Sequence, residues 1–376
     1  MDPTLTRLFN DFDHGKISRR HLLQALGVAA VAAPLTAAFG QGRCGGTNAG
    51  STACDTIPMK APFEPTGWKT VYMDHFSLQV EDYKKEVGYY AALMGWKVRS
   101  DDGTNAVMDI GDDVGSVIIR GGYVAPPPPH PRPAGDTAGG RGGRGGGRGG
   151  QGGPPRAPLR GVWDNFCWGI DNWDSKKVEA ELKRRGLEPI ADNVGKDFQS
   201  FHVKDPDGFD LQISNGNRKN RRQGSPKGPT PALPFESTGW KTVWLDHISF
   251  AVGNYKESTA FYQALLGWTP TRDEGSQNEC EIGEVGNIII RGGGSAASVP
   301  SPRRAVINHI SFGIQPFDPD EVKNALDKRG LTARMDTGGK LDIHDAAAKY
   351  KSYHTTTPAG WDLQISNATK ATRMVR

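Results

Sequence analysis

An internal repeat constrains the fold of this chain more than any other feature. Of the 376 residues, 62–80 read PFEPTGWKTVYMDHFSLQV and 234–252 read PFESTGWKTVWLDHISFAV. A second pair of segments also matches, because residues 208–215 read GFDLQISN and residues 360–367 read GWDLQISN. Self-similarity over such stretches is typical of repeated structural units. The sequence therefore predicts two homologous halves.

Each half is itself predicted to contain two units. Residues 164–170 (DNFCWGI) parallel residues 308–314 (NHISFGI), and each stretch opens the second unit of its half. A unit begins with a short alternating strand, continues with a helix of about three turns, and closes with three strand-like runs. Glycines stand where these helices would end in a left-handed cap, namely Gly95, Gly186, Gly267 and Gly330. The predicted order is βαβββ, four times over.

The chain also contains segments that cannot build a core. Residues 124–160 are rich in Pro, then in Gly and Arg. This stretch alone carries a formal charge of +5, whereas the whole chain carries +4, so the rest of the chain is close to neutral. We interpret them as an inserted solvated linker or anionic-surface tether, and no nucleic-acid partner is expected. The predicted boundaries are 1–40 (export signal), 41–61 (linker), 62–215 (first domain), 216–233 (linker) and 234–376 (second domain).

The amino-terminal segment has the anatomy of a signal peptide. Arg19 and Arg20 directly precede the apolar run 25–38, which ends in small residues. Paired arginines at this place are typical of the twin-arginine export route, which predicts a periplasmic or extracellular protein with no membrane span in its mature form. The alternative is an amphipathic surface helix. In an oxidising compartment Cys44 and Cys54 either pair or remain free thiols.

The doubled βαβββ order resembles the vicinal-oxygen-chelate superfamily, which includes glyoxalases, bleomycin-resistance proteins and extradiol dioxygenases. The resemblance implies an α+β fold in which four βαβββ modules pair into two domains, each with a cupped sheet around a metal. It also implies that the ligands come from the opening strand of each unit and from the last strand of the second. Carried over to this sequence, the ligands are His247, His309 and Gln364 in the second half.

The equivalent residues of the first half form a degenerate site. They are His75, Asn165 and Gln212, so an amide replaces one histidine. The superfamily's usual last ligand is a glutamate, and both halves have glutamine there. In the second half either Gln364 or Asp362, which lies on the same strand face, supplies the third ligand. The implied cofactor is a divalent ion such as iron, manganese, zinc or nickel.

Further polar residues complete the candidate site. His202 and His354 stand where the extradiol dioxygenases that these segments resemble have a tyrosine close to the metal. His354 is accordingly a candidate general acid or base, and the alternative is a plain hydrogen-bonded strand residue. Arg291, which ends a strand before a Gly-Gly turn, is a candidate for binding an anionic substrate, and His344 is a weaker one.

Together these features predict a metal-dependent enzyme that acts on a small molecule with two adjacent oxygens, by dioxygenase-type or glyoxalase-type chemistry. The metal is expected to bind in the second half. The alternative is a non-catalytic protein that sequesters a small molecule, as bleomycin-resistance proteins do. The loss of the carboxylate ligand in both halves favours that alternative.

Overall fold

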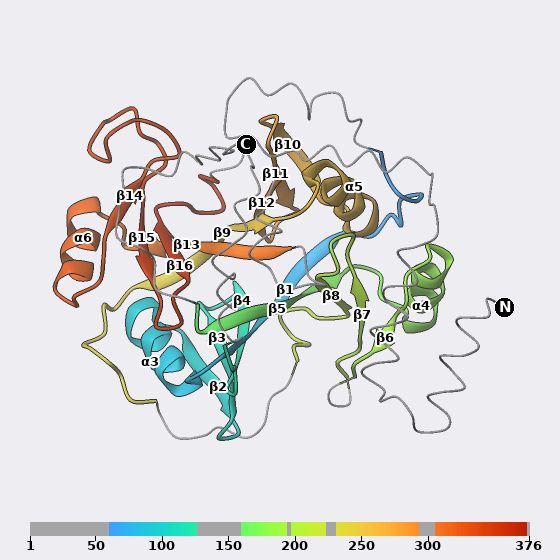
Figure 1. Ribbon diagram of the computed structural model, residues 1–376, viewed down its shortest axis with the longest axis horizontal. Coiled ribbons are helices and arrows are strands. Elements are labelled where there is room, and N and C mark those ends of the chain that lie inside the picture. Colours follow the sequence, from blue (N-terminus) through green and yellow to red (C-terminus); the bar gives the residue numbers. More distant parts are fainter. Residues whose placement is uncertain (1–59, 126–158, 194–196, 223–230, 293–304, 374–376) are drawn as a thin grey trace, which may run out of the picture. The chain divides into compact units, whose positions relative to one another are not determined.

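A computed structural model describes residues 60–125, 159–193, 197–222, 231–292 and 305–373. The first half forms ten elements in the predicted order of two βαβββ units (Figure 1). They are β1 (Thr70–Val80), α3 (Tyr83–Met94), β2 (Lys97–Asp101), β3 (Asn105–Ile110), β4 (Gly115–Arg120), β5 (Gly161–Ile170), α4 (Ser175–Arg184), β6 (Ile190–Ala191), β7 (Ser200–Lys204) and β8 (Asp210–Ser214).

The second half repeats this order. Its elements are β9 (Lys241–Ala251), α5 (Tyr255–Leu266), β10 (Thr269–Asp273), β11 (Gln277–Ile282), β12 (Gly286–Arg291), β13 (Val306–Gln315), α6 (Pro319–Asp327), β14 (Arg334–Asp336), β15 (Ser352–Thr356) and β16 (Asp362–Ser366). The α+β class and the four βαβββ units are therefore confirmed. The predicted export signal and nearly all of the insertion 124–160 lie outside the described residues.

Each half builds one eight-stranded mixed sheet. The strand order is β2-β3-β4-β1-β5-β8-β7-β6 in the first half and β10-β11-β12-β9-β13-β16-β15-β14 in the second. In both sheets the opening strands of the two units pair antiparallel at the centre, and each opening strand pairs parallel with the last strand of its own unit. Residues on β9, β13 and β16 are thereby brought side by side from separate segments of the second half.

The opening strands alternate in sequence as predicted, yet at the centre of each sheet both of their faces are buried. In β9 nine of eleven residues are buried, including Asp246, His247 and Ser249. One face packs into the apolar core, and the polar residues of the other face are covered by neighbouring polar side chains. The polar side chains of the central strands are thus held in a dry environment.

The helices of the opening units end as the sequence predicts. Gly95 and Gly267 have φ values of 68° and 69° and cap α3 and α5 in the left-handed conformation. A Cβ atom at Gly95 would lie 2.4 Å from the carbonyl oxygen of Trp240, and one at Gly267 would lie 2.4 Å from that of Trp68. Glycine is therefore required twice at each position, for the backbone angle and for the close approach of the other half.

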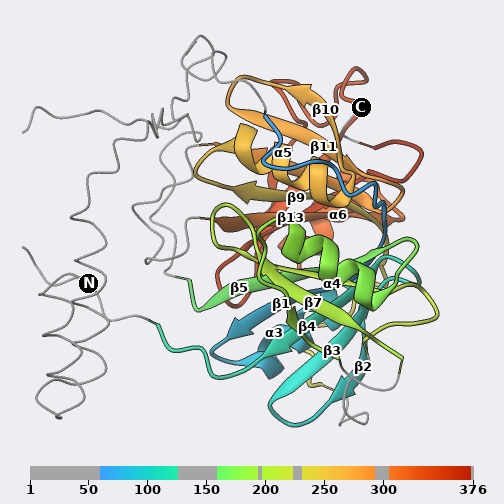
Figure 2. The same cartoon turned by 90° about the vertical axis from the view of Figure 1, so that its right-hand side faces the viewer.

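Equivalent bonds join the two halves in both directions. The indole of Trp96 donates to Thr242 Oγ1 over 2.9 Å, and that of Trp268 donates to Thr70 Oγ1 over 3.0 Å. The Trp96 ring also lies 5.2 Å from the Phe312 ring, in an edge-to-face contact. Figure 2 shows the second half, coloured yellow to red, packed against the first, coloured blue to green. The contacts repeat the symmetry of the sequence and hold the two sheets as one packed core.

No helix among the described residues is both long and apolar enough to cross a membrane.

Candidate metal centre

Three adjacent strands bring the predicted second-half ligands together. On β13, Ser311 pairs with His247 of β9 on one side and with Gln364 of β16 on the other. His309 lies two residues before Ser311 and projects from the same face of the sheet. The Nε2 atoms of His247 and His309 are 3.1 Å apart. Residues from three distant segments therefore converge at the centre of the second sheet.

This arrangement fits a divalent metal ion. Two nitrogens that bind one ion at about 2.1 Å are expected to lie about 3.0–3.4 Å apart, so the observed separation suits adjacent ligands. Gln364 is buried, and its Nε2 donates to Ser352 Oγ over 2.8 Å and to Tyr350 OH over 3.1 Å. Its Oε1 is buried without a hydrogen-bond partner in the described part of the chain. The amide is thus oriented with its oxygen available to a cation.

The protonation of His309 also suits a metal. Burial lowers the pKa of His309 well below its usual value, and the nearby charges of His247, His354 and Arg291 lower it further. His309 is therefore neutral, with a lone pair on one ring nitrogen. The other ring nitrogen of His247, Nδ1, lies 3.3 Å from Asp246 Oδ2. The carboxylate lies within ion-pair distance of this nitrogen but does not meet it in hydrogen-bond geometry, and Nε2 is left for the ion.

Asp246 is itself held by two hydroxyl groups. Ser311 Oγ and Tyr350 OH each donate to its Oδ2 over 2.7 Å. Burial alone would raise the pKa of Asp246, but His247 and these hydroxyls lower it overall, so the carboxylate is ionised. Asp246 is a functional residue that sequence reasoning missed, although the repeated Asp-His pairs at 74–75 and 246–247 were a signal for it.

His354 lies next to the His247–His309 pair, between two carboxylates. Its Nε2 is 3.3 Å from Asp336 Oδ2, its Nδ1 is 3.2 Å from Asp362 Oδ2, and its ring centre is 5.2 Å from that of His309. Burial lowers the pKa of His354, but the bonds to the two carboxylates outweigh burial and raise it. With its raised pKa, the His354 side chain can hold and release a proton beside the candidate ligands.

Asp362 has different partners from those expected of a ligand. Its Oδ1 accepts from Arg334 over 2.5 Å, and its Oδ2 faces His354. Burial raises its pKa, while His354 and Arg334 together lower it to about 2. Since both carboxylate oxygens are engaged and the Gln364 Oε1 is not, the geometry favours Gln364 as the third ligand. Sequence reasoning missed Asp336 and Arg334, which lie on the short edge strand β14.

The two predicted substrate-binding residues are placed differently. Arg291 lies close enough to His309 for its charge to affect the pKa of that histidine, and its Nε is buried without a hydrogen-bond partner. His344 has a 58% exposed side chain and lies 3.7 Å from Asp320 of α6. No described contact joins His344 to the other histidines, so the structure does not place it in the site. The polar stretch around it forms an exposed loop rather than a wall of the cup.

The first-half residues form a closed version of the same cluster. Asn165 Nδ2 donates to Gln212 Oε1 over 3.1 Å, so the amide oxygen that is unpartnered in the second half is occupied here. His202 lies 3.0 Å from Asp210 and 3.4 Å from Asp192, as His354 lies between its two carboxylates. The guanidinium of Arg222 contacts Asp192 over 2.5 Å.

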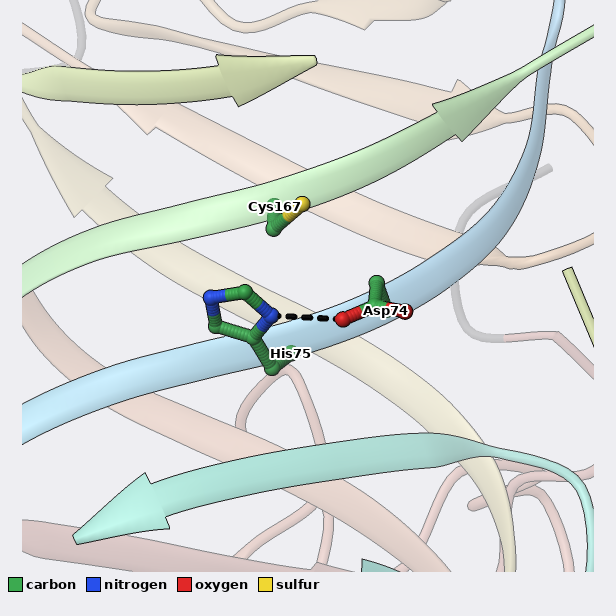
Figure 3. Close-up of side chains that lie close together, drawn as sticks. All are labelled: Asp74, His75 and Cys167. Carbon is green, nitrogen blue, oxygen red and sulfur yellow. Dashed lines mark hydrogen bonds and ion pairs between the residues drawn. The ribbon is translucent and has the colours of Figure 1, made fainter. Parts of the chain in front are cut away.

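A three-residue group in the first half has metal-binding side chains. Asp74 Oδ1, His75 Nδ1 and the Cys167 sulfur all lie within 4.8 Å of one another and are buried (Figure 3). The His75 and Asp74 atoms are 2.6 Å apart, which repeats the pairing of His247 with Asp246. Burial raises the pKa of Cys167 well above its usual value, so it is a thiol and a poor ligand. The group orients the His75 ring, and Cys167 is a small buried residue.

A larger opening lies elsewhere on the protein. A cavity of about 840 Å³ is lined by Tyr72, Lys97, Trp240, Trp244 and Lys370, among others. None of its lining residues belongs to the histidine cluster. Its lining includes lysines, an arginine and carboxylates but no histidine, so it does not resemble the cluster of the second half.

Comparison with known proteins supports the fold. Residues 244–329 match the sequence profile of the Glyoxalase/Bleomycin resistance protein/Dioxygenase superfamily. None of the curated proteins matches the sequence. The Mn(II)-bound glyoxalase from Novosphingobium aromaticivorans is similar in structure, with 14% identity, a TM-score of 0.52, and coverage of 80% of this chain and 82% of that one.

Two dioxygenases are similar to the same extent. The 2,3-dioxygenase LapB from Pseudomonas sp. KL28 has 12% identity and a TM-score of 0.50, over 79% of this chain and 92% of that one. Homoprotocatechuate 2,3-dioxygenase from Brevibacterium fuscum, in complex with 3,4-dihydroxyphenylacetate, has 15% identity and a TM-score of 0.51, over 83% and 84%. The chain thus has the fold of the Glyoxalase/Bleomycin resistance protein/Dioxygenase superfamily, and its segment 244–329 matches the sequence profile of that superfamily.

Proposed function

We propose that the second half is the active site of a divalent-metal-dependent enzyme that acts on a small molecule with two adjacent oxygens. The observation that carries the proposal is the convergence of the His247 and His309 Nε2 atoms, 3.1 Å apart, in the same site as the unpartnered Oε1 of Gln364. The residues would hold the ion through two nitrogens and one amide oxygen, which leaves coordination positions for a substrate. When bound, such an ion supplies Lewis acidity to the substrate oxygens.

The chain's own residues supply proton transfer. His354 holds a proton at Nε2, shared with Asp336, and its raised pKa keeps a fraction of it protonated near neutral pH. Its position beside His309 suits it to exchange that proton with a substrate that lies on the ligands. Asp246 fixes the His247 ring, while Ser352 and Tyr350 fix the Gln364 amide. Dioxygenase-type and glyoxalase-type reactions both require such a set, and the similar structures include one of each kind.

Metal content tests this proposal directly. The protein, purified without chelators and without a histidine tag, is expected to hold about one equivalent of a divalent ion. His247→Ala and His309→Ala are expected to lose it, whereas the matched first-half control His75→Ala is expected to keep it. Absence of metal in the wild-type protein, even after addition of iron, manganese, zinc or nickel, would contradict the proposal.

The neutral ligand set favours a second candidate function. Two histidines and an amide provide no negative charge to balance a divalent ion, as a glutamate would. A protein that only binds and sequesters a small molecule has no need of that charge. Turnover separates the two functions, because a sequestering protein binds diols or α-keto adducts without converting them.

We also propose that the protein is exported by the twin-arginine route. The support comes from Arg19, Arg20 and the apolar run that follows them. Replacement of both arginines by lysine is expected to retain the protein in the cytoplasm, measured by cell fractionation. Export of the doubly substituted protein at the wild-type level would contradict this.

A further inference from the structure

Arg120 and Arg291 occupy equivalent positions at the ends of β4 and β12, yet only one of them has a carboxylate partner. Arg120 forms an ion pair with Asp164 of β5. In the second half the residue equivalent to Asp164 is Asn308, which is exposed and uncharged. In the described part of the chain no carboxylate oxygen lies within ion-pair distance of Arg291, and its buried Nε has no hydrogen-bond partner. The second half thus has the arginine of the first half but not the aspartate that pairs with it.

Three carboxylates, Glu274, Glu279 and Asp336, act on the pKa of Arg291 through their charge, and each of them also lies beside another base. Glu274 and Glu279 both lie within 4.0 Å of Arg272, at 3.2 and 4.0 Å. Asp336 is bound to His354. The guanidinium is therefore a largely buried cation with no close counter-ion, which costs free energy unless an anion joins it.

Arg291 lies on the same side of the sheet as the candidate ligands. Ile289, two residues before it on the same strand face, pairs with Ser249, and Ser249 pairs with His309. Ser249 Oγ is also buried without a partner, as is Gln364 Oε1. A molecule that lies on the two histidines would therefore find unsatisfied donors toward the end of β12.

We propose that Arg291 binds an anionic group of the substrate, so that the substrate is a vicinal-oxygen compound that also carries a carboxylate. A guanidinium suits this role because it binds the two oxygens of a carboxylate in parallel and is weakly hydrated. The inference rests on the proposed function, since it places the two adjacent oxygens of the same molecule on the histidine cluster. It assigns Arg291 to specificity rather than to the reaction itself.

A matched pair of ligands tests the inference. Binding of 3,4-dihydroxyphenylacetate and of 4-ethylcatechol, which differ mainly in the carboxylate, is measured by calorimetry on metal-loaded protein without oxygen. The wild-type protein is expected to bind the carboxylate compound at least about tenfold more tightly. Arg291→Gln is expected to remove this preference. The matched control Arg120→Gln is expected to keep it.

A second variant removes the preference without removing the arginine. Asn308→Asp restores the acid that the first half has, so it is expected to occupy Arg291 and abolish the preference, while Asn308→Ala keeps it. Because Asn308 is exposed, this variant is expected to fold. Equal binding of both compounds by the wild-type protein, or a preference that survives Arg291→Gln, would overturn the inference alone. If neither compound binds the wild-type protein, both the inference and the proposed function are contradicted.

Discussion

The polar clusters at the centres of the two sheets share most of their residues and differ in whether they are closed. In the first half Asn165 occupies the Gln212 oxygen, Asp164 pairs with Arg120, and Arg222 covers Asp192. In the second half each equivalent of these contacts is missing among the described residues. A few substitutions have thus left the first cluster with contacts that the second lacks, although Asn165 Oδ1 in the first half also has no hydrogen-bond partner among the described residues.

The difference shows how a repeat separates stability from function. Closed polar networks are stable because every donor and acceptor has a partner. Unpartnered buried groups cost free energy, and they are retained where a ligand satisfies them. The first half therefore serves as a scaffold that holds the second, and exchange of single residues between the halves tests this view.

The largest effect is expected when the second half receives the first-half residue at position 309. His309→Asn removes one of two nitrogen ligands and provides an amide that can occupy the Gln364 oxygen, as Asn165 does in the first half. Metal affinity is expected to fall by about 100-fold or more, measured by competition with a chelator. Retention of wild-type affinity would show that His309 is not a ligand.

The same substitution at the equivalent glutamines is expected to strengthen metal binding in the second half and to destabilise the first half. Gln364→Glu adds the missing anionic ligand and should raise metal affinity roughly tenfold. Gln212→Glu places a carboxylate beside Ser200 and Asp192 with no ion, so it is expected to lower the free energy of unfolding by about 1–3 kcal/mol. A gain in metal affinity for Gln212→Glu would show that the first half is also a metal site.

The two partly buried histidines, His354 and His202, test where the halves are alike. In both, burial lowers the pKa but paired carboxylates raise it overall. A raised folded-state pKa contributes stability that is present below the unfolded value near 6.5 and is lost as pH rises through the folded value. His354→Gln and His202→Gln should each lower the free energy of unfolding on the order of 1–2 kcal/mol more at pH 5.5 than at pH 9.

Activity separates these two histidines. Only His354→Gln is expected to change the pH dependence of turnover, because only His354 lies beside the candidate ligands. The free energy of unfolding comes from denaturation at both pH values, and turnover is measured on intact metal-loaded protein. Equal loss of turnover in both variants would show that the first half takes part in the reaction.

The fold could be predicted from the sequence because the repeated segments are the same segments that form the strands. The family resemblance predicted that His247, His309 and Gln364 are ligands, and these residues lie together because they stand in regular strands, where register is set by neighbours. Asp336 and Arg334 were missed because β14 has only three residues and no repeat signal. The sequence could not predict that His344 lies beside Asp320 rather than beside the other histidines, because a polar loop carries no periodicity that fixes its direction. Which side chain bonds to a given polar atom, such as the Gln364 oxygen, can be seen only in the structure.

The smallest effect is expected at the Cys167 and Ser311 positions, which face equivalent aspartates. Ser311 donates to Asp246, and Asp246 in turn holds His247, so Ser311→Cys weakens an outer contact of the site. Metal affinity is expected to fall about tenfold at most, because Tyr350 still donates to the same oxygen. Cys167→Ser should change the free energy of unfolding by less than about 1 kcal/mol and leave metal content unchanged. A loss of metal on Cys167→Ser would instead mean that the Asp74, His75 and Cys167 group binds an ion, and the first half would then be a second site rather than a scaffold.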